Sequence, residues 1–144
     1  MTRAALAALW LTGCLDAIGP EVGPLQQPAA TCNDDSDPAR TVSFAADIVG
    51  GVFERGGCPR CHTNGGDGVQ QSGFDIASYA TLRAGGTRSK ASIVIDGKPC
   101  TSVLFEKIGP APPFGARMPR NDSPLSAADQ QLVHDWISEG ARDN

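Results

Sequence analysis

The sequence is poor in basic residues and has no long apolar stretch. Its 144 residues include 12 Lys and Arg against 16 Asp and Glu, a formal net charge of −4. No basic stripe is present to neutralise phosphates, which argues against nucleic acid as a partner and favours proteins with basic surfaces. The apolar residues 4–11 are too few to cross a bilayer as a helix. No internal repeat is visible, and the length favours a single domain.

The N-terminus has the features of an export signal. Arg3 supplies a positive charge, and residues 4–11 lead into Leu11-Thr12-Gly13-Cys14. This tetrapeptide resembles the bacterial lipoprotein box, which implies cleavage before Cys14 and diacylglycerol on its sulfur. We therefore predict a lipoprotein signal peptide over residues 1–13 and a lipid anchor at Cys14. The expected location is the cell envelope, as a periplasmic or outer-surface lipoprotein; an ordinary signal peptide with a chance cysteine is the alternative.

Two segments are expected after the signal peptide. Residues 14–40 contain four prolines and no periodic apolar pattern, which predicts a flexible tether between the lipid and the domain. Residues 41–144 form the predicted domain.

Cys32 and Cys100 remain once Cys14 is assigned to lipid and Cys58 and Cys61 to a CxxC pair. An even pair of cysteines in an oxidising compartment predicts a disulfide between them. Two free thiols are the alternative.

Helical patterns dominate the domain, so we predict an all-α fold. Residues 43–56 have helical apolar spacing with Ser43 as N-cap, and residues 76–84 and 101–108 suggest shorter helices. The last helix begins at Ser126, with Asp129 placed for a partial capping box, and ends at Gly140. Residues 93–95 suggest a short extended run, and residues 65–73 and 109–124 read as loops.

Cys58-Pro59-Arg60-Cys61-His62 is a CxxCH sequence. Two thiols at this spacing can reach both vinyl groups of one haem, and the adjacent histidine then becomes the proximal iron ligand. CxxC pairs also occur in zinc sites and redox dithiols. The export signal and the preceding helix favour haem c, covalently attached and one per chain.

Met118 is the predicted second axial ligand of the iron. It is the only methionine besides Met1, and it lies in a loop between glycine and proline, where packing gives little reason for a methionine. His134 is the alternative ligand, expected at the edge of the apolar stripe of the last helix.

In order and spacing, these features resemble class I cytochrome c over about residues 43–142. The resemblance implies an N-terminal helix crossing a C-terminal helix, with short helices and long haem-wrapping loops between them. It also implies that Cys58 and Cys61 bind the haem vinyls, with His62 proximal and Met118 distal. The helices would cross where Gly50 or Gly51 lets Trp136 approach. The motifs that carry the resemblance are Phe44 with Ile48, Met118-Pro119, Leu125-Ser126, and Trp136-Ile137-Ser138-Glu139-Gly140-Ala141.

The sequence departs from that family after the haem histidine. Many relatives have a proline there whose carbonyl accepts the imidazole proton, whereas here Thr63-Asn64-Gly65-Gly66 follow, so the acceptor for His62 is unidentified. Candidate donors to the haem propionates are Arg88, Lys107, Arg117 and Arg120. Candidate wall residues are Phe44, Phe53, Phe74, Ile76, Leu82, Leu104, Phe105 and Trp136.

The resulting hypothesis is a mono-haem one-electron carrier rather than an enzyme, because two axial ligands leave the iron no open position. Its partners would be redox proteins, it could serve as a redox subunit of a larger oxidoreductase, and it would have no small-molecule substrate. One alternative is a haem-based enzyme or sensor in which Met118 is displaced. The other is a haem-free surface lipoprotein that uses CxxCH as a disulfide or zinc site, with Cys32 or Cys100 as a further zinc ligand.

Overall fold

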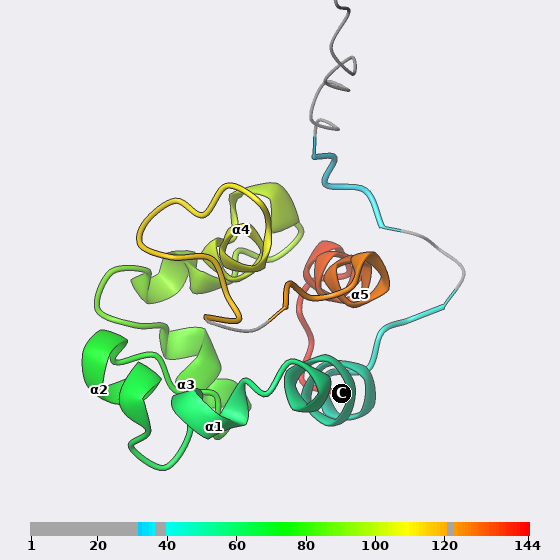
Figure 1. The fold of residues 1–144 in the computed structure, drawn as a ribbon. Coiled ribbons are helices and arrows are strands. Elements are labelled where there is room, and N and C mark those ends of the chain that lie inside the picture. The colour runs from blue at the N-terminus through cyan, green and yellow to red at the C-terminus, as the bar shows by residue number, and fades with distance from the viewer. Residues whose placement is uncertain (1–31, 37–39, 121–122) are drawn as a thin grey trace, which may run out of the picture. The chain divides into compact units, whose positions relative to one another are not determined.

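The computed structural model describes residues 32–36, 40–120 and 123–144 (Figure 1), so the predictions for residues 1–13 and for Cys14 lie outside the described residues. The described residues contain helices and no strands, which confirms the all-α prediction. No helix among them combines the length and apolar character needed to cross a bilayer. In chain order the elements are the π-helix η1 (Phe44–Phe53), α1 (Pro59–His62), α2 (Asp67–Ser72), α3 (Tyr79–Ala84), the 3₁₀ helices η2 (Lys90–Ile93) and η3 (Pro99–Thr101), α4 (Val103–Ile108) and α5 (Ala127–Ser138).

The first and last helices, η1 and α5, pack against each other to form the centre of the core. Ile48 and Val52 on η1 are fully buried, as is Ile137 on α5. The C-terminus returns to the start of η1, as Figure 1 shows, where the Ala45 N–H donates to the Asn144 carbonyl at 2.9 Å. The two ends of the domain therefore close on one another.

The glycines of η1 do not serve the approach of Trp136, so that prediction was wrong. A Cβ at Gly50 would lie 3.3 Å from the Ala45 carbonyl oxygen, and a Cβ at Gly51 would lie 3.3 Å from that of Ala46. Each of these carbonyls lies five residues earlier, so the glycines relieve crowding produced by the π-helical winding itself. Trp136 instead stacks on Phe44, with ring centroids 5.2 Å apart.

The predicted helix starts agree with the structure at both principal helices. Ser43 accepts from the Ala46 N–H and Ser126 from the Asp129 N–H, so both serines are confirmed as N-caps. One local prediction was wrong: residues 65–73, expected as a loop, contain α2, which ends in the left-handed conformation of Gly73. The short extended run expected over residues 93–95 is present only in part, because Ile93 ends η2 while Val94 is extended. The Ile95 N–H donates to the Ser102 hydroxyl at 2.8 Å.

Arg55, which follows η1, forms an ion pair with Asp129 at the start of α5. The Arg55 guanidinium, assisted by the Ser126 hydroxyl, holds the pKa of Asp129 below its usual range. Arg55 is itself more than half exposed, so solvent screening limits the strength of the pair.

Replacing Asp129 with asparagine is expected to lower the free energy of unfolding at pH 7 by about 1 kcal/mol. Because the pKa of Asp129 is depressed in the folded state, its contribution is present above the ordinary aspartate pKa of about 4 and is lost as the pH falls through the folded value. Urea unfolding of wild type and Asp129→Asn at pH 7 and near pH 2 checks this. The exposed Asp143→Asn is the control. If Asp129→Asn lowered the free energy of unfolding by the same amount at both pH values, the proposed contribution of the Asp129 carboxylate would be contradicted.

Candidate functional site

A cavity of about 450 Å³ opens into the domain beside α1 and the loop after α4. Three of the four predicted haem-binding residues line it, namely Cys58, His62 and Met118. The remaining walls are mostly apolar, as expected for a site that binds a flat organic cofactor. The apolar wall residues are Val52, Phe53, Phe74, Ile76, Ile93, Val103, Leu104, Ile108, Phe114, Leu125 and Val133.

Half of the predicted wall residues lie elsewhere. Phe44 and Leu82 belong to the buried core, and Phe105 packs against the ring of His134 at 5.4 Å between centroids. Trp136 is held in the core by its indole N–H, which donates to the Arg142 carbonyl at 2.9 Å. Helical spacing identified these side chains as buried, but it could not separate the cavity walls from the helix–helix core.

His62, at the end of α1, is held in one orientation. Its Nδ1 lies 3.0 Å from the Phe74 carbonyl oxygen, and the Ile76 N–H donates to the His62 carbonyl at 2.8 Å. A carbonyl can only accept, so Nδ1 carries the proton and Nε2 keeps its lone pair for a metal. This contact supplies the acceptor that the sequence left unidentified. Nothing in the sequence marks Phe74, because the carbonyl of any residue could serve.

Gly68 on α2 lies directly against the imidazole. A Cβ at this position would come within 2.6 Å of His62 Cε1 and 2.8 Å of the Cys61 carbonyl oxygen. The close approach therefore requires glycine, and it lets α2 pack on the back of the ring. Sequence reasoning missed this residue, although the glycines that follow His62 were a usable signal.

Cys58 and Cys61 are free thiols in different environments. Cys58 is half-buried in the cavity wall, and burial raises its pKa to about 11, whereas Cys61 is exposed and outside the lining. A protonated thiol is a poor nucleophile, so burial does not favour Cys58 as the attacking thiol of a redox dithiol.

Among the described residues, the cysteines and histidine of the CxxCH sequence belong to no cluster of three or more closely spaced metal-ligating side chains. In the described part of the chain, the one cluster of three cysteine, histidine or carboxylate donors is Cys32, Cys100 and His134. Both of its sulfurs are joined in a disulfide, which removes them as thiolate ligands.

Met118 reaches the cavity from the loop that follows α4. Its backbone N–H donates to the Lys107 carbonyl at 2.8 Å, and its side chain is half-buried against the core. The thioether and the imidazole of His62 therefore line the same apolar space.

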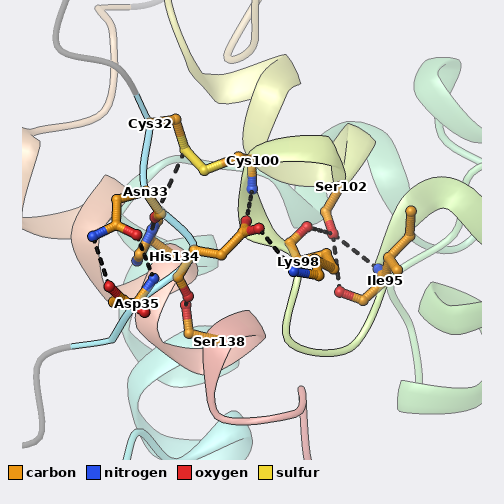
Figure 2. A network of polar contacts seen from close by, with 10 residues as sticks. Cys32, Asn33, Asp35, Ile95, Lys98, Cys100, Ser102, His134 and Ser138 are labelled. Atoms are coloured by element: carbon orange, nitrogen blue, oxygen red, sulfur yellow. Dashed lines mark hydrogen bonds and ion pairs between the residues drawn. A yellow bond between two sulfur atoms is a disulfide. The ribbon is translucent and has the colours of Figure 1, made fainter.

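His134 does not line this cavity. It was expected at the edge of the last helix, but it is buried on α5, because the segment that begins at Cys32 covers it. Its Nε2 contacts the Asn33 carbonyl (Figure 2), and its Nδ1 lies 3.1 Å from the Asp135 carboxylate. With both ring nitrogens engaged by these oxygens, the structure does not favour it as an iron ligand.

Among the described residues, the charged lining of the cavity consists of the cations Arg88, Lys107 and Arg120, with no acidic side chain. Burial lowers the pKa of Lys107, and the neighbouring Arg88 lowers it further. An uncompensated cluster of this kind suits a ligand with anionic groups. Arg117, the fourth predicted donor, lies outside the lining and donates from Nε to the Ile108 carbonyl at 2.9 Å.

Cys32 and Cys100 form the predicted disulfide, with Cα atoms 5.6 Å apart (Figure 2). Asp34 extends this junction: its carboxylate accepts from the Cys100 N–H at 3.1 Å, and its carbonyl accepts from the Ser138 hydroxyl at 2.7 Å. The Cys100 N–H holds the pKa of Asp34 below its usual range. Residues 32–36, predicted as the end of the tether, are thus fixed to the domain, which begins at Cys32 rather than at residue 41.

Comparisons with protein-family models, with curated proteins and with solved structures find no match to this chain. The case for its function therefore depends on the residues of the cavity.

Proposed function

We propose that this chain is a mono-haem c-type cytochrome with a cytochrome c-like fold, which carries one electron at a time in the cell envelope. The observation that carries the proposal is the placement of Cys58, His62 and Met118 on the walls of one apolar cavity. These three side chains come from two distant parts of the sequence, so CxxCH spacing alone does not bring the methionine to the histidine.

The residues present fit a haem. The cavity volume lies within the range of about 300–1,000 Å³ that is usual for small-molecule and cofactor sites. Cys58 and Cys61 would each add across one vinyl group: the sulfur bonds to one carbon and the thiol proton goes to the other. This addition needs no oxidant and releases no leaving group. His62 Nε2 and the Met118 sulfur would hold the haem iron.

The bound haem would supply a one-electron couple between ferrous and ferric iron. The protein's own contribution is to hold His62 through the Phe74 carbonyl, to present Met118, and to keep water away with apolar walls. With His62 and Met118 both holding the iron, no ligand position would remain for a substrate. This is the physical reason to propose a carrier for redox proteins rather than an enzyme.

Two of the four predicted propionate donors keep that role. Lys107 and Arg117 donate to loop and helix carbonyls. Arg88 lies over the Phe114 ring with no hydrogen bond to any other described residue, and Arg120 has only a 3.5 Å contact with Gln71. We assign Arg88 and Arg120 to the propionates.

The same proposal includes lipid attachment at Cys14, removal of residues 1–13 and location at a membrane face, all supported by the sequence.

Expression in a host that matures c-type haems tests this proposal. The wild-type protein is expected to retain one haem per chain through a denaturing gel, because thioether bonds survive denaturation. Cys58→Ala/Cys61→Ala should lose that stain completely.

Cys32→Ser/Cys100→Ser is the matched control, since it removes the other cysteine pair and should keep the haem. A wild-type protein that matures without colour would overturn the proposal. Rapid carbon monoxide binding by the reduced wild type would instead favour a haem-based enzyme or sensor.

A further inference from the structure

Lys107, on the last turn of α4, contacts the loop that carries Met118 at three points. Its ammonium group donates to the Phe114 carbonyl at 2.7 Å and also to the Ala116 carbonyl. Its own backbone carbonyl accepts from the Met118 N–H at 2.8 Å. One residue thus fixes the loop immediately before the methionine and at the methionine itself.

The loop has one other hydrogen bond to the end of the helix among the described residues, from Arg117 Nε to the Ile108 carbonyl at 2.9 Å. The Phe114 ring lies between two cations, 5.2 Å from Lys107 Nζ and 5.6 Å from the Arg88 guanidinium. Phe114 is half-buried, while Gly115 and Ala116 are exposed. Phe114 and Met118 are partly buried against the core, and between them the charged hydrogen bonds of Lys107 hold the exposed residues 115 and 116 to the helix.

We propose that Lys107 is a positioning residue that keeps Met118 at the cavity. The inference rests on the proposed function, because it concerns the sulfur as an iron ligand. A thioether binds iron weakly, so its occupancy depends on how much of the time the loop holds it in place. Lys107 differs here from Arg88 and Arg120: two loop carbonyls already engage its ammonium group, so it serves the loop rather than a propionate.

The test compares wild type with Lys107→Leu, which keeps an aliphatic stem but removes the donors. Haem content on a denaturing gel is expected to be unchanged. The sulfur-to-iron charge-transfer band of the ferric protein should weaken. Added imidazole should bind the ferric iron at least about tenfold more tightly, because the apparent affinity of a competing ligand rises when the loop leaves the iron. Lys107→Arg, which retains a charged donor, should recover most of the band.

Lys98→Leu is the matched control, because Lys98 is an exposed lysine whose ammonium group pairs with Asp34 away from the loop. It should leave the band and the imidazole affinity unchanged. If Lys107→Leu fails to fold, Lys107→Gln provides the comparison. The intensity of its charge-transfer band should lie between that of the wild type and complete loss. If the Lys107 variants carry haem and show the charge-transfer band and the imidazole affinity of the wild type, the role of Lys107 would be overturned while the proposed function would stand. Absence of haem from the wild type would overturn the proposed function and this inference with it.

Discussion

Replacing Met118 with alanine is expected to leave the haem attached while opening one face of the iron. The reduction potential should fall by on the order of 0.1 V or more, a fraction of the roughly 0.8 V over which axial ligands tune haem proteins. The reason is that a thioether is a poor donor to ferric iron and so favours the ferrous state. Reduced Met118→Ala should also bind carbon monoxide, because alanine has no atom able to ligate iron.

A redox titration and a carbon monoxide titration of the same samples measure both effects. Val103→Ala is a suitable control, since Val103 lines the same cavity and is buried but has no atom able to ligate iron. It should bind no carbon monoxide and shift the potential much less. If Met118→Ala kept the wild-type potential and remained closed to carbon monoxide, Met118 would not be the sixth ligand. His134 is an improbable substitute, because it lies outside the cavity with both ring nitrogens engaged.

The parts of the site that depend on residue type could be predicted from the sequence. A CxxCH motif places two thiols and an imidazole on one short helix by spacing alone, and Met118 stood out because it was the only methionine left in the domain. Ser43 and Ser126 were recognised as N-caps because few residue types can accept from the first turn of a helix.

The parts that depend on backbone atoms could not be predicted. The acceptor for His62 is the Phe74 carbonyl, and the loop before Met118 is held through the carbonyls of Phe114 and Ala116. Every residue has a carbonyl, so no pattern of side chains identifies which one will be used. The same limit applies to Gly50 and Gly51: the atoms nearest to an added Cβ are carbonyl oxygens of their own π-helix and, at Gly51, the Arg55 guanidinium, rather than the tryptophan that the resemblance implied.

The position of the domain boundary shows a related limit. Prolines and the absence of apolar spacing favoured a tether up to residue 40. Yet Asn33 contacts His134 and Asp34 reaches Cys100 and Ser138, so polar contacts around one disulfide extend the domain back to Cys32. The pattern of apolar and polar residues along the chain does not reveal a segment that is held to the domain by a disulfide and by hydrogen bonds.

Removing this disulfide is therefore expected to produce the largest loss of stability. Cys32→Ser/Cys100→Ser should lower the free energy of unfolding by about 4 kcal/mol, the chain-entropy estimate for the 68-residue separation of the two cysteines. The physical reason is that the unfolded chain gains the freedom that the closed loop denied it, while the folded state loses little contact area. Guanidinium unfolding of the haem-loaded protein measures the effect.

Asp34→Asn separates the covalent link from the hydrogen bonds around it. It weakens the contacts to Cys100 and Lys98 but keeps the disulfide, so it should cost clearly less than the double serine variant. Neither cysteine lines the cavity, so the double serine variant should keep the wild-type haem spectrum and reduction potential at temperatures where it remains folded. A shift in the axial-ligand spectrum of that variant would mean that the strap at residues 32–36 is coupled to the Met118 loop. Loss of stability with an unchanged spectrum would show that the disulfide anchors the N-terminal segment and leaves the iron site alone.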